Sequence, residues 1–202
     1  MSTAPTGDLQ RLTQWWSEHG PQPERRVAWI VDPVDEVEAR LAVDRAVDSG
    51  SNLIALLAHG SAIAARATIS LQAKVTPVQV LDQPADLSDI EWMRQVAAIR
   101  DLRAGGEPHA AEPAIAAVAS LFIAARERAT PVLFDGLTAH AGAMSTQQFD
   151  SRWLPASSAT DPAIEVAQQY WRVLPAIDLK LRADDDLGLR AVLALWDVVD
   201  GD

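Results

Sequence analysis

Three adjacent carboxylates, Asp184, Asp185 and Asp186, are the strongest local candidate for chemistry in this chain. Repulsion between neighbouring carboxylates favours a proton on one of them, so that one could serve as a general base. The same oxygen atoms could bind a hard cation instead. A structural role also stays open, because acidic residues at the start of a helix complement the helix dipole.

Two turns that follow apolar runs are further candidates. His59-Gly60-Ser61 follows the run Leu53–Leu57, and Asp135-Gly136 ends a run that begins at Thr130. Ligands of open parallel sheets bind beyond the carboxyl ends of the strands, and free amides at a helix start can receive a phosphate. The first turn lacks the repeated glycines of a dinucleotide site and the lysine of a P-loop, and a structural turn explains Asp135-Gly136 equally well.

Composition disfavours several function classes. The chain of 202 residues carries a formal net charge of −11, which repels nucleic acids and anionic lipids, and it contains no Cys. Its four His form no i, i+4 ligand pair, and neither a His-Glu-x-x-His nor a Gly-x-Ser-x-Gly motif occurs. The sequence also lacks a signal-peptide pattern and an apolar run of the roughly 20 residues that cross a bilayer. We therefore expect a cytoplasmic protein with no metal, no cofactor and no nucleic-acid or membrane partner.

The elements that position these candidates follow from apolar patterning. Short apolar runs alternate with longer helical patterns, which is typical of a parallel sheet covered by helices. We expect an α/β fold, Rossmann-like with three layers and a small helical part from the chain ends. Residues 1–26 are expected to form an N-terminal helical segment and residues 27–202 a single domain. The expected strands are 27–31, 53–57, 77–81 and 130–135, and the expected helices are 9–18, 62–71, 88–103, 115–128, 162–171 and 187–199.

Some local patterns carry expectations of their own. A further helix is predicted to begin at Asp32-Pro33, with Val34, Val37 and Leu41 on one face. From Ser151 onward the pattern loosens, and residues 157–160 are expected to form a loop. Most of the seven Trp are expected in the core, although Trp15 and Trp16 could cover a partner or a second subunit instead.

The C-terminal third resembles a known enzyme family. The segments Pro131–Gly136, Ala141–Ala143 and Leu174–Arg182 are similar to the nicotinate-nucleotide:dimethylbenzimidazole phosphoribosyltransferases, which make the lower ligand of cobalamin. A weaker similarity extends upstream through Ala46–Ile54 and Gly105-Gly106. The resemblance implies a parallel α/β sheet with a small helical domain. It also implies a pentosyltransferase activity that moves ribose phosphate from nicotinate mononucleotide to a benzimidazole nitrogen.

The resemblance assigns roles to the candidates. Asp185 matches the family's general base, which is a Glu, and Asp184 and Asp186 stand where the family has glycines. An Asp is one methylene shorter, and a misplacement of about 1 Å can cost on the order of a hundredfold in rate. The other matched positions are expected to bind substrate. Around residues 59–61 most of the family's glycines are replaced, and around residue 157 both of its His residues are replaced. The substrate-binding positions are His59, Gly60, Ser61, Asp135, Gly136, Ser157 and Arg182.

Three hypotheses follow. The first is a shortened, active enzyme that acts on nicotinate mononucleotide or a relative of it. The second is a binding or regulatory relative without catalysis, which pairs with a full-length family enzyme or holds a benzimidazole or corrinoid fragment. The third hypothesis is an unrelated activity in a remodelled pocket, for which a metal at residues 184–186 is the concrete form. The expected partners are a small-molecule nucleotide or benzimidazole ligand and a second copy in a homodimer, or a full-length family enzyme.

Overall fold

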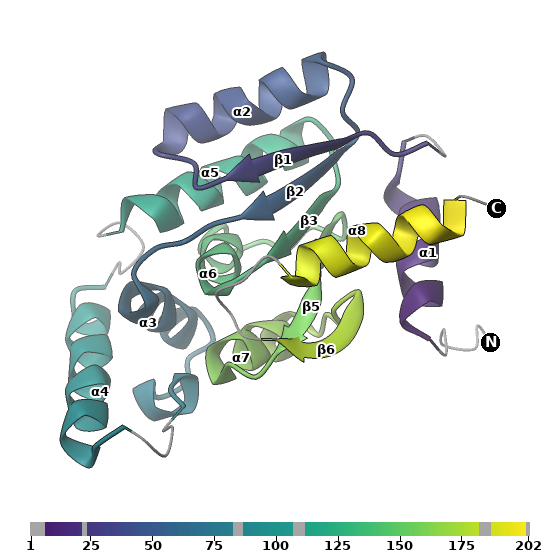
Figure 1. Ribbon diagram of the computed structural model, residues 1–202. Helices are drawn as coiled ribbons and strands as arrows, with labels where there is room; N and C mark the ends of the chain where they lie inside the picture. Colours follow the sequence, from purple (N-terminus) through teal and green to yellow (C-terminus); the bar gives the residue numbers. More distant parts are fainter. Residues whose placement is uncertain (1–6, 22–23, 83–86, 107–111, 182–186, 201–202) are drawn as a thin grey trace.

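A parallel sheet organises the fold in the computed structural model (Figure 1), which describes residues 7–21, 24–82, 87–106, 112–181 and 187–200. Its four described strands are β1 (Val27–Val31), β2 (Leu53–Leu57), β3 (Val132–Asp135) and β4 (Trp153–Pro155), in that spatial order. Val31 pairs with Leu57, and Leu57 with Asp135, so the strands end in one row. A second parallel pair joins β5 (Ser157–Ala159) to β6 (Ile177–Leu181).

Helices cover both faces of this sheet, as predicted. One face packs against α2 (Glu36–Asp48), α5 (Pro113–Glu127) and α6 (Leu137–Ser145), and the other against α1 (Asp8–His19) and α8 (Leu187–Asp200). Strand β2 is buried throughout, because Ile54 and Leu56 face the first layer while Leu53, Ala55 and Leu57 face the second. The result is a three-layer α/β fold in which α1 and α8, from the two chain ends, form one layer.

Beyond the carboxyl ends of the strands lies a further group of helices. It comprises α3 (Ala62–Gln72), α4 (Asp89–Ala104) and α7 (Pro162–Trp171), which share a core cluster with α6. Ser61 and Ser88 cap α3 and α4 by accepting hydrogen bonds from backbone amides of the first turn. The Ser88 hydroxyl and amide also bind the Glu91 carboxylate and lower its pKa, which completes a capping box.

The structure corrects several predictions about local elements. Residues Pro77–Val80 form a 3-10 helix instead of a strand, because Pro77 occupies its first turn and Thr76 and Gln79 cap it reciprocally. Helix α2 begins at Glu36, capped by Asp35, so Asp32-Pro33 does not start a helix.

Helix α2 also buries a different face from the one that its larger apolar residues suggest. The core contacts come from Ala39, Val43 and Ala46. Val34 and Val37 are 76% and 68% exposed. Of the residues that the structure describes after Ser151, three segments are strands, and one of them, β5, occupies the predicted loop at 157–160.

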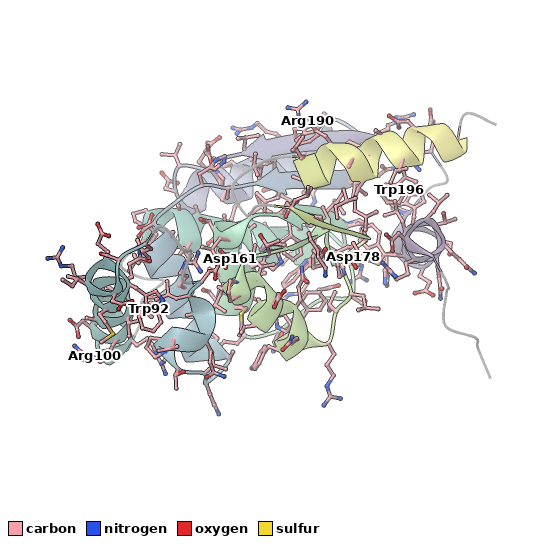
Figure 2. The ribbon with its side chains drawn as sticks, turned by 60° about the horizontal axis from the view of Figure 1, so that its bottom comes forward. Trp92, Arg100, Asp161, Asp178, Arg190 and Trp196 are labelled. Carbon is pink, nitrogen blue, oxygen red and sulfur yellow. The ribbon has the colours of Figure 1, made fainter. Side chains whose placement is uncertain are left out.

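The Trp residues of the chain ends belong to the core. Trp15 and Trp16 of α1 are buried and lie 6.1 Å and 5.6 Å from Trp196 of α8, measured between ring centroids. Figure 2 shows Trp196 between the two helices. Trp15 and Trp16 therefore hold α1 on the protein's own α8.

The helices in the described part of the chain include none with the length and apolar character of a membrane span.

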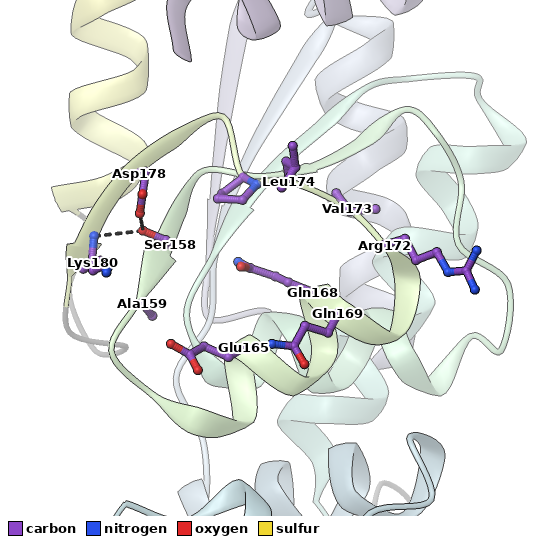
Figure 3. Close-up of a pocket in the computed structure, with 11 residues that line it drawn as sticks. Ser158, Ala159, Glu165, Gln168, Gln169, Arg172, Val173, Leu174, Asp178 and Lys180 are labelled. Atoms are coloured by element: carbon purple, nitrogen blue, oxygen red, sulfur yellow. Dashed lines mark hydrogen bonds between the residues drawn. The ribbon is translucent and has the colours of Figure 1, made fainter. Parts of the chain in front are cut away.

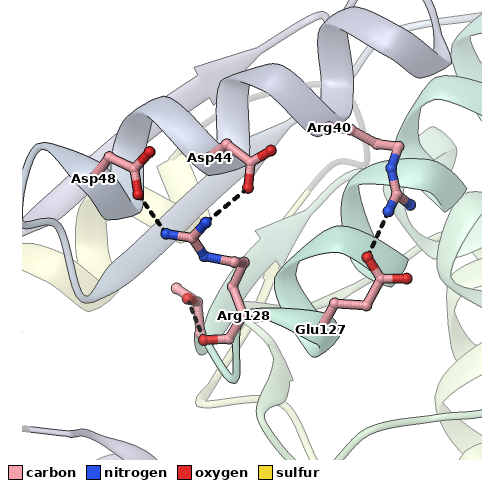
Figure 4. A network of polar contacts seen from close by, with 6 residues as sticks. Arg40, Asp44, Asp48, Glu127 and Arg128 are labelled. Atoms are coloured by element: carbon pink, nitrogen blue, oxygen red, sulfur yellow. Dashed lines mark hydrogen bonds and ion pairs between the residues drawn. The ribbon is translucent and has the colours of Figure 1, made fainter.

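Charged contacts tie α2 to the end of α5 (Figure 4). The Arg128 guanidinium, directly after α5, lies between Asp44 and Asp48 of α2 and is 3.1 Å from the Asp44 carboxylate. Arg40 of α2 pairs with Glu127 of α5. All of these side chains are at least one-third exposed, so the pairs orient the two helices more than they stabilise the fold.

Candidate functional site

The candidate site lies at the carboxyl edge of the sheet, where the loops after β1, β2 and β3 meet. A Cβ atom placed on Gly60 would lie 3.2 Å from Thr138 Oγ1 and 3.3 Å from Glu112 Oε1, so the turn after β2 closely approaches the starts of α5 and α6. A pocket of about 360 Å³ opens between the starts of α2 and α5. This is the edge at which ligands of parallel α/β proteins bind.

The turn His59-Gly60-Ser61 is the exposed part of the site. All three residues are exposed, and the turn leads directly into the first turn of α3. The His59 amide donates to Asp32 Oδ1 over 2.7 Å, and the His59 ring atom Nδ1 lies 3.0 Å from the same oxygen. The turn therefore presents helix-start amides and an imidazole, which suit a phosphate or a proton transfer.

Asp135, Gly136 and Ser157 form the buried part of the site. Ser157 Oγ donates to Asp135 Oδ2 over 3.1 Å, and the Gly136 amide donates to Asp135 Oδ1 over 2.9 Å. Asp135 and Ser157 are 4% and 1% exposed. A Cβ atom on Gly188, in the first turn of α8, would lie 1.9 Å from Asp135 Oδ2, so only a glycine allows α8 to begin against this carboxylate.

Two further buried side chains complete a closed hydrogen-bond circuit. His140 of α6 donates from Nδ1 to the Gly136 carbonyl over 2.8 Å. Gln168 of α7 places its amide nitrogen 3.4 Å from His140 Nε2 and donates to the Ser157 carbonyl over 3.2 Å. Burial lowers the pKa of His140 to about 4, so the ring is neutral and its Nε2 can accept from Gln168. The circuit links β3, α6, α7 and β5 beneath the edge of the sheet.

The predicted base and one predicted binding residue, Asp185 and Arg182, lie outside the described residues. The described neighbours of that segment are Leu181, at the end of β6, and Leu187, at the start of α8. The adjacent Gly188 lies against Asp135, as given above. Within the described part of the chain, no three His, Asp or Glu side chains come close enough together to hold a metal ion.

Comparisons with known proteins identify the family. A family model described as Phosphoribosyltransferase matches residues 38–199. The chain belongs to this phosphoribosyltransferase family.

Named relatives of this phosphoribosyltransferase-family chain agree with one another. This chain is 28% identical over 203 residues to the nicotinate-nucleotide–dimethylbenzimidazole phosphoribosyltransferase of Corynebacterium efficiens. The match covers 87% of this chain and 55% of the relative. It is 27% identical over 219 residues to the protein of that name from Corynebacterium glutamicum, covering 94% of this chain and 61% of the relative. The chain therefore spans little more than half the length of these relatives.

Solved structures support the fold. The enzyme of the same name from Thermus thermophilus superposes with a TM-score of 0.66 at 18% identity, over 82% of this chain and 54% of that one. At this identity the likeness establishes a shared fold, and it agrees with the α/β architecture described above.

A second pocket of this phosphoribosyltransferase-family chain, of about 540 Å³, lies between α7 and the β5–β6 pair (Figure 3). Residues of α7, β5, β6 and the loop after α7 line it. Ser158 there donates to Asp178, whereas its neighbour Ser157 faces Asp135, because successive strand residues point to opposite sides. Figure 3 shows Gln168 extending from α7 into this region. Gln168 therefore borders both the pocket and the buried circuit.

The amino-acid sequence does not identify Asp32, His140, Gln168 or Glu112 as site residues. Its pattern places Asp32 in a helix start and presents His140 only as a possible metal ligand. All four residues reach the site only through tertiary contacts. Gln168, for example, is 28 residues away from its partner His140 along the chain. The one usable signal is position, because Asp32 follows an apolar run as Asp135 ends one.

Proposed function

We propose that this chain binds nicotinate mononucleotide at the carboxyl edge of the sheet and transfers its ribose phosphate to a benzimidazole nitrogen. The observation that carries the proposal is the close approach of the exposed turn 59–61 to the start of α6, which follows the buried Asp135, at the edge where parallel α/β proteins bind ligands. The names of the relatives supply the substrate class.

The residues divide into two roles in this proposal. Gly60, Ser61 and the amides at the start of α3 other than that of Ala64, which Ser61 caps, receive the phosphate, because free amides and the helix dipole favour an anion there. Asp135, Gly136 and Ser157 hold the shape of the site from below. Asp185 accepts the proton that the benzimidazole nitrogen loses, and Arg182 contributes to substrate binding.

The alternative is an inactive relative that binds a ligand or a partner, such as a second copy or a full-length family enzyme. One observation favours it: both Asp135 oxygens already accept hydrogen bonds within the protein, and the side chain is 4% exposed. A carboxylate in this state does not reach a substrate unless α8 moves.

Release of nicotinate tests the proposal. We expect purified protein to release nicotinate from nicotinate mononucleotide faster when dimethylbenzimidazole is present. Asp185→Asn should lower kcat of this transfer by about 10²- to 10⁴-fold, the usual contribution of a general base. Asp184→Asn is the matched control, because it removes the same charge from the same segment without removing the proposed base.

Three outcomes are informative. Loss of transfer in Asp185→Asn alone supports the enzyme. Nucleotide binding without transfer under any condition supports the inactive relative. Absence of nucleotide binding by calorimetry contradicts the enzyme and the nucleotide-binding form of the alternative, and leaves a relative that acts through a partner.

A further inference from the structure

Asp32 and His59 form a carboxylate–imidazole pair next to the proposed nucleotide site. The His59 ring atom Nδ1 lies 3.0 Å and 3.1 Å from the two Asp32 oxygens, and the His59 amide donates to one of them over 2.7 Å. Both side chains are 52% exposed. The pair is therefore fixed in geometry and open to solvent.

The backbone holds the carboxylate in this position. Asp32 adopts a φ of 47°, in the left-handed region that non-glycine residues seldom occupy, and its amide donates to the Leu57 carbonyl over 3.0 Å. This conformation turns the chain sharply at the end of β1 and directs the carboxylate to the end of β2. Backbone strain of this kind is often found at functional sites.

The contact with Asp32 determines what the imidazole can do. A carboxylate at Nδ1 retains the proton there, so the other ring nitrogen, Nε2, carries the free electron pair. The described residues provide no hydrogen-bond partner for Nε2, and no third metal ligand accompanies the pair. An imidazole arranged in this way is suited to remove a proton from a small molecule that approaches from solvent.

The pair also occupies its own part of the sheet edge. Asp32 and His59 follow β1 and β2, whereas the start of α8 lies against Asp135, the last residue of β3, and Ser157, the first residue of β5. The pair on the β1 side is therefore separate from the buried Asp135 and Ser157.

We propose that His59, oriented by Asp32, is a general base that activates water, so that the chain hydrolyses nicotinate mononucleotide to nicotinate and ribose 5-phosphate when no benzimidazole is bound. This inference rests on the proposed function, because it requires the nucleotide to bind at the same edge.

The step balances without a further reactant. A water oxygen forms a bond to ribose C1′ while the bond from C1′ to the pyridinium nitrogen breaks. The electron pair of that bond stays on the ring nitrogen, which becomes neutral, so the leaving group needs no acid. His59 Nε2 takes one proton from the water and returns it to solvent. A base is therefore the one proton-transfer group that this hydrolysis requires.

The test follows nicotinate release from nicotinate mononucleotide in the absence of any benzimidazole, with nucleotide binding measured separately by calorimetry. His59→Ala should lower kcat of hydrolysis by about 10²- to 10⁴-fold. It should change the Kd for the nucleotide far less, because the amides of α3 remain. Added imidazole should restore part of the rate, since the vacated position is open to solvent. Asp32→Asn should also lower kcat, because an amide does not hold the imidazole proton at Nδ1 as a carboxylate does.

His19→Ala is the matched control, because His19 lies on α1, at the far side of the molecule from the sheet edge, and its loss should leave hydrolysis unchanged (Figure 1). Nucleotide binding without hydrolysis, or hydrolysis that His59→Ala does not slow, overturns this inference and leaves the proposed transferase intact. A loss in His59→Ala that imidazole does not restore also overturns it. Absence of nucleotide binding overturns both proposals.

Discussion

His140 lies fully inside the protein, between the Gly136 carbonyl and the Gln168 amide, with its ring 5.0 Å from that of Phe134. Protonation would place a hydrogen on Nε2 opposite the Gln168 amide hydrogens and would bury a positive charge. Burial therefore lowers the pKa of His140 to about 4, against an ordinary value of 6.5. The same ring supports the Asp135 turn, so its neutral form is part of the site's structure.

This pKa predicts how stability depends on pH. The unfolded chain takes up a proton at His140 near pH 6.5, whereas the folded chain does so only near pH 4. The contribution of His140 to the free energy of unfolding is therefore fully present above pH 6.5. It falls by about 3 kcal/mol as the pH drops to 4. Urea unfolding of the wild type and of His140→Asn, which cannot titrate, should show this slope in the wild type and a reduced slope in the variant. Parallel curves for the two proteins would contradict the prediction.

The contribution of an ion pair between helices to the free energy of unfolding depends on how deeply the pair is buried. Arg66 of α3 forms two hydrogen bonds, of 3.0 Å and 2.6 Å, to Asp161, which also caps α7. The two side chains are 15% and 11% exposed. The Arg128–Asp44 pair between α5 and α2 is 35% and 46% exposed. Removal of one charge from the first pair leaves a largely buried guanidinium without its counter-ion.

We expect Asp161→Asn to lower the free energy of unfolding by on the order of 3 kcal/mol, although the amide can still cap α7. Asp44→Asn, the exposed control, should cost about 0–1 kcal/mol. Chemical denaturation of both variants at pH 7 measures the difference. Equal losses would show that burial does not set the strength of these pairs.

The elements that could be predicted from the sequence are those with a strong pattern. Strands β1, β2 and β3 are continuous apolar runs, and the capping residues of α3 and α4 mark their starts. Helix α6 gives no such signal, because all but one of its nine residues are buried, which leaves no apolar periodicity. Strand β4 has only three residues, and β6 is largely exposed, so neither gives a strand pattern.

The candidate site could be predicted only in part. Position after a strand located His59–Ser61 and Asp135-Gly136 correctly at one edge of the sheet. Sequence could not show that the first group is exposed and the second buried, because the start of α8 at Gly188 covers Asp135 from far along the chain. The contacts of Asp32 and Gln168 depend on tertiary structure in the same way.

At the scale of the whole molecule, three layers bring distant segments to a single edge. The turns after β1, β2 and β3 meet there, and the helices α3, α4, α6 and α7 form a core cluster beside them. The pocket between α7 and β6, of about 540 Å³, is a second place that could hold a mononucleotide. We propose that the nucleotide occupies the sheet edge and not this pocket.

A crystal structure of the protein with nicotinate mononucleotide tests that claim most directly. We predict the phosphate within hydrogen-bond distance of the amides at the start of α3, beside Gly60 and Ser61, with the ribose toward His59. Nucleotide bound in the pocket lined by Gln169 and Lys180, with the sheet edge empty, would contradict the account.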